Sequence, residues 1–382
     1  MKVLVVGCGN IGSVAAEDLA RNVKSAEVTV ADNDKTRAKA VAEKIGTENV
    51  SWKQIDVSNH KELTNTLKDS DLVMGFLPGK LGYGFAEACV AAGKDLVDVS
   101  YMAENPLDLN DKALKNDVTI VPDCGLAPGI SNVLVGHAVS KLDVVETVQI
   151  MVGGLPEKPI PPLGYSITWS PESLIDEYTR KARIVKKGKI AEVEALTGLE
   201  QIAFPGFGKL EAFYTDGLRT LMYTIKARNM WEKTLRYPGH ADKINLIRAL
   251  GFFEEKEIEV DGAAVSPRKL TAKLLGQKLR RSEIKDVVAL EVGVAGIKGQ
   301  KRIKYLYRLL DYCDAKQGVT AMARTTAYPA SIVAQLLVKR RVEEKGVVPP
   351  ENLGMRGEIF EAFLNELEKR GVKIKVKSTT SD

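Results

Sequence analysis

The first residues whose types and spacing suggest chemistry are three glycines near the N-terminus, in the stretch VLVVGCGNIG. Gly7, Gly9 and Gly12 follow a run of Val and Leu and open a helical pattern, which is typical of a loop that binds a dinucleotide. Gly7 permits a sharp turn, Gly9 lets the backbone approach a pyrophosphate, and Gly12 lets the helix pack closely on the strand. The pyrophosphate would then lie at a helix N-terminus.

An acidic residue follows this motif at the expected distance. Asp32 lies 20 residues after Gly12, at the end of the second apolar run. A carboxylate at this place accepts hydrogen bonds from both ribose hydroxyls and repels a 2′-phosphate. We therefore expect NAD as the cofactor, although Lys35 and Arg37 lie just beyond and could weaken that preference.

Two later loops are expected to contribute to the same dinucleotide site. Asp56 and Val57 follow the third apolar run, where a carboxylate and an apolar contact suit an adenine edge, and Leu77 and Pro78 follow the fourth, toward the nicotinamide. The alternative for both is an ordinary loop between a strand and a helix. The full set of predicted cofactor-binding residues is Gly7, Gly9, Asn10, Ile11, Gly12, Asp32, Asp56, Val57, Leu77 and Pro78.

Ionisable side chains follow the fifth and sixth apolar runs. Asp98 and Tyr101 come after the fifth run, and Asp123 lies in the loop PDCGLAPG after the sixth. Both loops are expected to face the crevice at the carboxyl ends of the strands. Asp123 could equally be a turn residue or a helix cap.

Only one of the three histidines is placed for chemistry. His60 lies at a polar helix start and His137 on an apolar helix, so we expect neither to react. His240 lies in KTLRYPGHADK with Arg236, a loop that could present a carboxylate-binding fork and a titratable imidazole together. The alternative is a histidine at a helix start with basic surface neighbours.

The elements that must position these residues alternate between short apolar runs and helical stretches. Near-continuous Val, Leu and Ile runs fit strands that are buried on both faces of a parallel sheet. We therefore predict an α/β, Rossmann-type doubly wound parallel sheet. Its strands are expected at residues 2–6, 27–31, 50–55, 71–76, 95–99 and 118–122.

After residue 140 the pattern changes to longer extended runs, which predict an α+β domain with a largely antiparallel sheet. The stretch DVVALEVGVAGIKGQKRIKYLYRLLDY indicates a long hairpin that turns at Lys298, Gly299 and Gln300. Helices are expected at about 240–250, 267–280, 320–340 and 355–370. We predict a dinucleotide-binding domain at residues 1–125, completed by C-terminal helices in 319–382, and a substrate-binding and oligomerisation domain at 126–318.

Composition indicates a soluble globular protein. The chain has 382 residues, 45% of them hydrophobic and 27% charged, with a net charge of +5. We see no signal peptide and no apolar run of the roughly 18 residues that a membrane span needs. Four separated cysteines argue against a disulfide framework and a metal site, so we expect the cytoplasm. Neither a nucleic acid nor a membrane is expected as a partner, because the basic cluster Lys186, Lys187 and Lys189 indicates a solvated hairpin.

Several stretches together resemble one known family. The Rossmann start, the loop DCGLAPGISN, VGGLPEKPIPPLGY, LEAFYTDG, KTLRYPGHADK and TAMARTTAYPA occur in order along nearly the whole chain and resemble the saccharopine dehydrogenase family. The resemblance is greatest to the branch that deaminates lysine at its ε-carbon. It implies NAD-dependent release of ammonia from L-lysine, a semialdehyde product that cyclises, and a homodimer or homotetramer built through the second domain.

The chemistry that the resemblance implies needs a base. A hydride leaves a carbon bearing an amine only when the nitrogen is deprotonated, and the lysine ε-ammonium has an ordinary pKa of about 10.4. His240, Tyr101 and Asp123 are the candidates for the catalytic residue that takes this proton. For the substrate-binding residues, Asp98, Asp123 or Glu211 would attract the ammonium group and Arg236 would hold the α-carboxylate.

Two alternatives remain open. A saccharopine reductase or a carboxynorspermidine-type dehydrogenase joins or splits a C–N bond and needs more cationic groups, to which Arg180, Arg183, Arg219 and Arg228 could contribute from positions that the sequence does not fix. A non-catalytic NAD-binding sensor would bind NADH without amine-dependent turnover.

Overall fold

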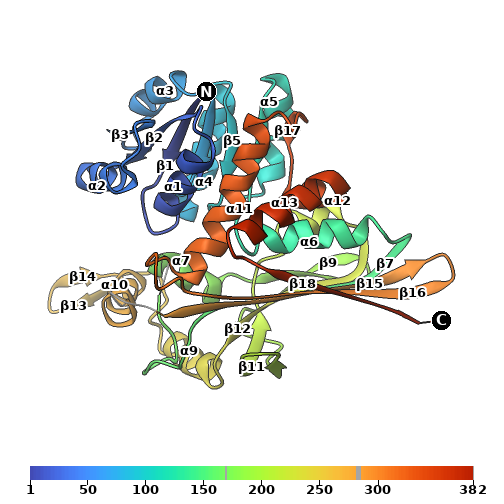
Figure 1. Ribbon diagram of the computed structural model, residues 1–382. Coiled ribbons are helices and arrows are strands. Elements are labelled where there is room, and N and C mark those ends of the chain that lie inside the picture. The colour runs from blue at the N-terminus through green and yellow to red at the C-terminus, as the bar shows by residue number, and fades with distance from the viewer. Residues whose placement is uncertain (168–169, 281–284, 382) are drawn as a thin grey trace. The chain divides into compact units, whose positions relative to one another are not determined.

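The computed structural model describes residues 1–167, 170–280 and 285–381, and the chain divides into two compact units. The first unit contains Met1–Lys141, Arg219–Thr224 and Ala323–Ile374. The second contains Leu142–Leu218, Ile225–Met322 and the residues from Lys375 on. Both units are therefore built from separated parts of the sequence. Each is described by itself below (Figure 1).

The first unit has a parallel sheet of seven strands in the order β17-β6-β5-β4-β1-β2-β3. The order reverses at β1 and β4, which is the switch point where doubly wound sheets bind ligands. The six predicted strands are confirmed, and the seventh, β17, was not predicted because it is only two residues long. The strands are β1 Lys2–Val6, β2 Glu27–Asp32, β3 Val50–Gln54, β4 Leu72–Gly75, β5 Asp95–Asp98, β6 Thr119–Val121 and β17 Gly346–Val347.

Helices connect and cover these strands. Apolar side chains such as Leu4, Val73, Phe85 and Leu96 form the core with which the helices pack. The helices of the first unit include α1 Gly12–Asn22, α2 Lys35–Ile45, α3 His60–Lys68, α4 Gly79–Ala91, α5 Asn110–Lys115, α6 Ile130–Val139, α8 Leu221–Thr224, α12 Pro350–Met355, α13 Gly357–Lys369 and most of α11, Ala321–Val338.

A buried polar network ties the C-terminal helices to α1. Asp18 of α1 accepts hydrogen bonds from Ser331 (2.6 Å) and Gln335 (3.2 Å) of α11, and its other oxygen pairs with Arg370 at 2.7 Å. α6 and α12 cross closely, since a Cβ on Gly136 would lie 2.0 Å from the Glu351 carbonyl oxygen. This packing explains why the compact units differ from the predicted boundaries, with α6 in the first unit.

The second unit has a mixed sheet of nine strands. Seven follow the order β10-β11-β12-β7-β15-β16-β18, and β8 pairs with β12 and β9. β12 and β7 run parallel, and the other pairs whose register is known are antiparallel, so the predicted largely antiparallel sheet is confirmed. The strands are β7 Val144–Pro156, β8 Ala182–Lys186, β9 Lys189–Val193, β10 Glu200–Phe204, β11 Gly208–Tyr214, β12 Ala227–Arg236, β15 Asp286–Lys298, β16 Lys301–Tyr312 and β18 Ile374–Ser381.

The predicted long hairpin is formed by β15 and β16, with Lys298 opposite Lys301 and Gly299 in a left-handed conformation. The helices α7 Pro171–Thr179, α9 His240–Ala249 and α10 Pro267–Leu279 share a core with Tyr165, Tyr178 and Phe213. A separate two-stranded sheet joins β13 Ile258–Val260 to β14 Ala263–Val265.

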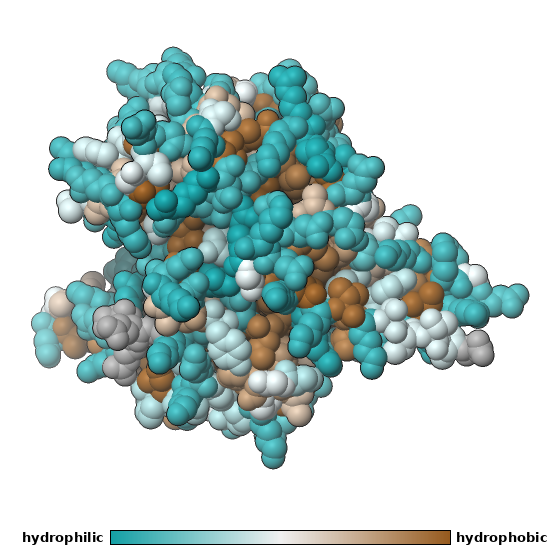
Figure 2. Space-filling view, in the orientation of Figure 1, coloured by the Kyte–Doolittle hydropathy of each residue, from teal (hydrophilic) through white to brown (hydrophobic). Residues whose placement is uncertain are grey.

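The surface is mostly hydrophilic on the face shown in Figure 2, with smaller hydrophobic patches. Within the described part of the chain, no helix has both the length and the apolar character that crossing a membrane requires.

Candidate active site

The glycine turn after β1 is shaped by close backbone contacts. Gly7 has a φ of +96°, and a Cβ there would lie 2.4 Å from the Phe76 carbonyl oxygen. A Cβ on Gly12 would lie 1.9 Å from the Gly7 carbonyl oxygen. Both positions therefore require glycine for the fold itself. At Gly9, in contrast, a Cβ would meet no heavy atom within 4 Å, so the fold does not need glycine there and the open space suits the approach of a pyrophosphate.

The carboxylate of Asp32 is held against this turn. Its two oxygens accept hydrogen bonds from the backbone N–H groups of Cys8 (2.8 Å) and Asp34 (2.9 Å). The Arg37 guanidinium lies 3.7 Å from the same carboxylate, and Lys35 lies over the Trp52 ring. This corner combines the carboxylate that favours a ribose 2′-hydroxyl with two cations that would attract a 2′-phosphate.

The remaining predicted cofactor residues lie at the same edge of the sheet. Asn10 and Ile11 continue the glycine turn; Asp56 and Val57 follow β3, and Leu77 and Pro78 follow β4. The carboxyl ends of β4, β1, β2 and β3 are neighbours in the sheet. Asp56 accepts the Ser58 N–H at 2.9 Å and so also shapes its own turn. The residues present fit a dinucleotide because the open Gly9, the helix N-terminus and the Asp32 carboxylate occupy adjacent strand ends.

Asp98 ends the neighbouring strand β5 and is fully buried, with 0% of its surface exposed. Its oxygens accept hydrogen bonds from the Ser100 N–H (2.8 Å) and hydroxyl (3.0 Å). Gly75 makes room for it, since a Cβ there would lie 2.1 Å from the carboxylate. Burial, with a smaller contribution from the charge of Asp123, raises the pKa of Asp98 to about 7 against the opposing effects of Ser100 and Arg219.

Asp123 follows β6 and forms a buried ion pair with Arg219. The Arg219 Nε lies 3.2 Å from one Asp123 carboxylate oxygen and 3.3 Å from the other. The Arg219 guanidinium also donates to the Glu104 carbonyl oxygen and lies 5.8 Å from the centre of the Tyr101 ring. The structure therefore brings Asp98, Tyr101 and Asp123 to the same sheet edge. Arg219 was one of four arginines that the sequence did not place.

The loop residues Arg236 and His240 lie in the second unit, where both are buried. Arg236 donates to Glu177 (2.7 Å) and to the Leu235 carbonyl oxygen (2.9 Å), and its guanidinium lies 4.5 Å from the centre of the Tyr165 ring. The group expected to bind a substrate carboxylate thus has a carboxylate partner within the protein.

Both ring nitrogens of His240 are also engaged. Nδ1 lies 2.9 Å from the Leu163 carbonyl oxygen, which can only accept, so Nδ1 carries the proton and Nε2 accepts from the Tyr178 hydroxyl at 2.8 Å. Burial, with a smaller contribution from the Arg236 charge, lowers the pKa of His240 to about 3.

Glu211 lies in β11 opposite Arg236, the last residue of β12, and its side chain reaches the start of α9. Its two oxygens accept the backbone N–H groups of Gly239 (2.7 Å) and Ala241 (2.6 Å). A carboxylate at this place satisfies donors that a helix N-terminus leaves without partners. Arg236, His240 and Glu211 therefore come together around α9, but in the interior of the second unit. Their predicted roles in substrate binding and catalysis stay predictions.

Glu232 is a further buried acidic residue of the second unit, and nothing in the sequence around it indicates that it is buried. One oxygen accepts the Thr215 hydroxyl at 3.0 Å, and the other has no hydrogen-bond partner among the described residues. Burial raises the pKa of Glu232 to about 8. Gly217 is required beside it, because a Cβ there would lie 1.0 Å from the second oxygen.

Cys124 follows Asp123 in the chain and is buried. Burial raises the pKa of the Cys124 thiol well above its usual range, which favours the protonated and less reactive form of the thiol. In residues 1–167, 170–280 and 285–381, no group of three or more His, Cys, Asp or Glu side chains is arranged to hold a metal ion.

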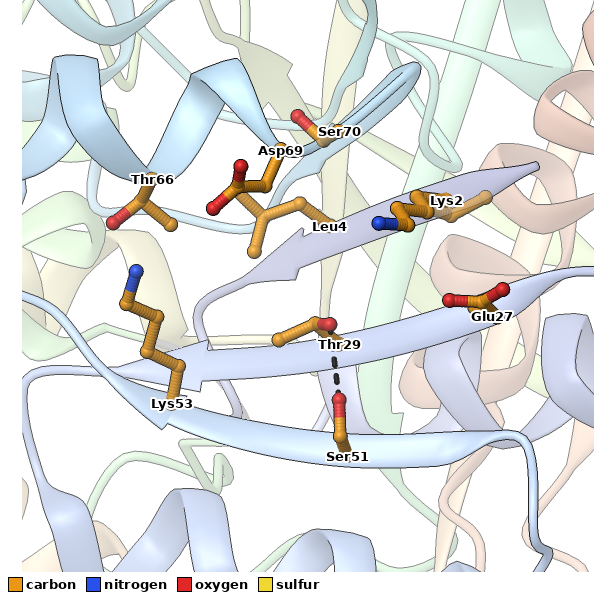
Figure 3. A pocket seen from close by; sticks show the side chains of 10 residues that line it. Lys2, Leu4, Glu27, Thr29, Ser51, Lys53, Thr66, Asp69 and Ser70 are labelled. Carbon is orange, nitrogen blue, oxygen red and sulfur yellow. Dashed lines mark hydrogen bonds between the residues drawn. The ribbon is translucent and has the colours of Figure 1, made fainter.

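A cavity of about 240 Å³ lies elsewhere in the first unit (Figure 3). It is lined by side chains of β1, β2 and β3, among them Lys2, Thr29 and Lys53, and the hydroxyls of Thr29 and Ser51 are hydrogen-bonded at 3.0 Å. Lys2 begins β1, whereas the glycine turn follows its end. This cavity is therefore separate from the dinucleotide edge.

Comparison with known proteins shows the family. Residues 3–121 match the model of the saccharopine dehydrogenase NADP binding domain, and residues 125–372 match that of the saccharopine dehydrogenase C-terminal domain. The fold is that of the apo saccharopine dehydrogenase (L-Glu forming) from Saccharomyces cerevisiae, with a TM-score of 0.79, 21% identity and 99% of each chain covered.

Two relatives illustrate the range of activities among similar proteins. The α-aminoadipic semialdehyde synthase of Arabidopsis thaliana is 25% identical over 98% of this chain and 45% of its own length. The carboxyaminopropylagmatine dehydrogenase of Synechocystis is 22% identical over 92% of each chain. The chain thus spans about half the length of the semialdehyde synthases that it matches.

Proposed function

Because the chain belongs to the saccharopine dehydrogenase family, a family of oxidoreductases, we propose that it oxidises a carbon bearing an amine with a nicotinamide cofactor. The specific proposal is a lysine 6-dehydrogenase. L-lysine, NAD⁺ and water would give aminoadipate semialdehyde, ammonia, NADH and a proton, and the semialdehyde would cyclise to piperideine-6-carboxylate with loss of water. NAD, when bound, supplies the acceptor for the hydride that leaves the ε-carbon.

One observation carries the proposal. The sheet edge that holds the dinucleotide features after β1 and β2 continues without a break to the buried ionisable groups after β5 and β6. In doubly wound sheets the reacting end of a dinucleotide points from the switch point toward this side. This continuity supports the proposal that a substrate amine meets the cofactor beside Asp98, Asp123 and Arg219.

Asp98 is proposed as the acceptor of the ammonium proton. A base is most effective when its pKa lies near the working pH, and burial brings Asp98 to about 7. Ser100 donates its hydroxyl to Asp98 and can pass a proton between the carboxylate and the amine. Asp123 and Tyr101 would orient the amine nitrogen, so that its lone pair is available when the hydride leaves.

His240 is proposed to position its neighbours instead of acting as the base. The Nε2 lone pair already accepts a hydrogen bond from the Tyr178 hydroxyl. An imidazolium at this buried place would also face the Arg236 charge, which is why the His240 pKa lies near 3. Arg236 and Glu211 are likewise proposed to shape the second unit through their internal hydrogen bonds.

The charge balance supports a substrate with one carboxylate. Arg183, Arg219 and Arg236 each face a protein carboxylate, those of Asp216, Asp123 and Glu177. A partner with several carboxylates would need cations that are not neutralised in this way. L-lysine carries a single carboxylate and so needs fewer such cations than saccharopine does.

A second candidate is the oxidation of a secondary amine with cleavage of a C–N bond. It is favoured by the names of the similar proteins, which include saccharopine dehydrogenases and the carboxyaminopropylagmatine enzyme. A non-catalytic sensor that only binds the nicotinamide cofactor is the third candidate.

Turnover tests these candidates. Reduction of NAD and of NADP is followed by NADH or NADPH absorbance with L-lysine, L-ornithine, saccharopine and carboxylated polyamines. Turnover with L-lysine and NAD is expected. Turnover only with saccharopine or a carboxylated polyamine would move the function to C–N cleavage, and NADH binding without any turnover would favour the sensor. Light scattering of the same sample tests the proposed homodimer or homotetramer.

A further inference from the structure

The segment that carries Arg219 is short and strongly constrained. Residues 219–224 connect two strands of the second sheet, yet they belong to the first unit. Arg219 has a φ of +53°, which a non-glycine residue keeps only where its surroundings fix it. α8 follows at once, and its Leu221 is fully buried. Something in the first unit must therefore hold this turn in place.

Glu351 of α12 contacts the turn directly. Glu351 has 0% of its surface exposed, and its Oε1 accepts a hydrogen bond from the Thr224 hydroxyl at 2.6 Å. The backbone N–H of Thr224 also donates a hydrogen bond to the Thr220 carbonyl oxygen at 3.1 Å. The carboxylate thus fixes the end of the helical turn whose beginning carries Arg219.

The other oxygen of Glu351 reaches, through Asn132, the loop that carries Asp123. Oε2 accepts the Asn132 amide at 3.0 Å, and the Asn132 oxygen in turn accepts the N–H of Gly129 at 3.4 Å. Gly129 closes the loop that begins after β6 and carries Asp123. One buried carboxylate therefore links the segment of Arg219 with the segment of Asp123.

We propose that Glu351 is a positioning residue that holds Arg219 and Asp123 in register, one oxygen for each segment. The proposal rests on the proposed function, in which this ion pair borders the reacting amine. Burying a carboxylate between α12, α8 and α6 costs desolvation free energy, and apolar side chains would join these helices at a lower cost. A role in orientation explains why a charged group occupies this place.

Glu351→Gln tests the proposal because an amide cannot accept both hydrogen bonds. The readout is Asp98, which faces Asp123, Arg219 and Ser100, with the Cys89 and Cys124 thiols also near. Displacing the Arg219 charge removes an effect that lowers the Asp98 pKa. The acid limb of the kcat/KM profile is then expected to move upward by about 0.5 pH unit, and kcat/KM at neutral pH to fall about twofold.

Two controls separate positioning from simple loss of stability. Asp18→Asn removes another buried carboxylate of the first unit, so it should lower the Tm and leave the limb where it is. In an Arg219→Gln background, Glu351→Gln should move the limb less than it does in the wild type, because only the Asp123 segment is left to shift. A limb that is unchanged by Glu351→Gln, or one that moves as far without Arg219 as with it, would overturn the proposal.

A measurement without turnover separates this inference from the proposed function. The ¹³C resonance of the Asp98 carboxyl group is assigned by its loss in Asp98→Asn and titrated in the full-length wild-type and Glu351→Gln proteins. An upward movement of its midpoint in the variant supports the positioning role even if no amine is turned over. An unchanged midpoint contradicts that role even if the wild type oxidises L-lysine.

Discussion

Asp123 and Arg219 lie 96 positions apart in the chain, form a buried ion pair at 3.2 Å, and share the same left-handed backbone conformation with φ of 53°. Neither is a glycine, so each position costs on the order of 1 kcal/mol or more of backbone strain. Two strained residues that face each other at a sheet edge indicate an arrangement kept for the site. Strain of this kind is common where side chains are oriented for binding or catalysis.

Arg219→Gln is expected to destabilise the protein by about 3–5 kcal/mol, because it removes the cation that pairs with the buried Asp123 carboxylate. Denaturant unfolding measures this change. Arg219→Lys keeps the charge but loses the planar fork, and we expect an intermediate loss of stability. Equal stability of all three proteins would show that the pair does not hold the loop after β6.

Asp98→Asn should remove the acid limb of the pH profile. In the wild type, kcat/KM for an amine should rise as the pH increases through about 7, because Asp98 must be deprotonated to accept a proton. The variant should lose about 100-fold in kcat/KM near neutral pH and keep only the rise at alkaline pH that comes from the substrate ammonium. A variant that retains the limb near pH 7 would exclude Asp98 as the base.

Asp32 and Arg37 should set the choice of cofactor in opposite directions. Asp32→Ala is expected to improve the ratio of kcat/KM for NADP over NAD about tenfold or more, since it removes the charge that repels a 2′-phosphate. Arg37→Ala should lower the same ratio. If Asp32→Ala leaves the ratio unchanged, the carboxylate shapes the glycine turn through Cys8 and Asp34 only.

Glu232→Gln should stabilise the protein at alkaline pH. The folded-state pKa of about 8 lies above the ordinary value of 4.5, so the folded state binds a proton that the unfolded chain releases. The stability contributed by this proton is complete below pH 4.5 and is lost as the pH rises through about 8. At about pH 9 the variant should exceed the wild type by on the order of a few kcal/mol, with little difference at about pH 5.

Glu211→Gln is the matched control for this measurement. Its carboxylate accepts two backbone N–H groups at the start of α9, so the variant should lose stability at both pH values. A Glu232→Gln protein that is less stable than the wild type at both pH values would show that Glu232 is ionised in the folded state.

His240→Gln should lower the Tm and leave the pH profile of kcat/KM unchanged. The substitution breaks the hydrogen bonds to Leu163 and Tyr178 but removes no group that titrates near neutral pH. Tyr178→Phe, which removes only the hydroxyl partner, should cause a smaller loss of Tm. Loss of the acid limb in His240→Gln would restore the histidine as the base.

The fold could be predicted from the sequence where a pattern is long or repeated. The six apolar runs indicate buried parallel strands, and this order alone places Asp98 and Asp123 at the sheet edge that also carries Asp32. The two residues of β17 are too few for any periodic signal, and β17 was missed.

The partners of these residues could not be predicted, for physical reasons. Arg219 reaches the first unit from a connection within the second sheet, and nothing in its neighbours marks that change of unit. An arginine and a histidine such as Arg236 and His240 can bind substrate in an open site, or can be buried with all of their hydrogen bonds made inside the protein. Only burial distinguishes these cases, and burial depends on contacts such as those with Glu177 and Tyr178.

The pairing of β17 with β6 has a consequence for protein synthesis. The Thr119 hydroxyl donates to the Glu344 carbonyl oxygen across 225 positions, and Gly346 and Val347 complete the sheet next to it. A chain emerging from the ribosome exposes the β6 edge until residues 344–347 have been translated, and the face of α1 around Asp18 until residues 331–370 have been translated. Such an edge pairs readily with other chains, so nascent and C-terminally truncated forms are the species that most need a chaperone.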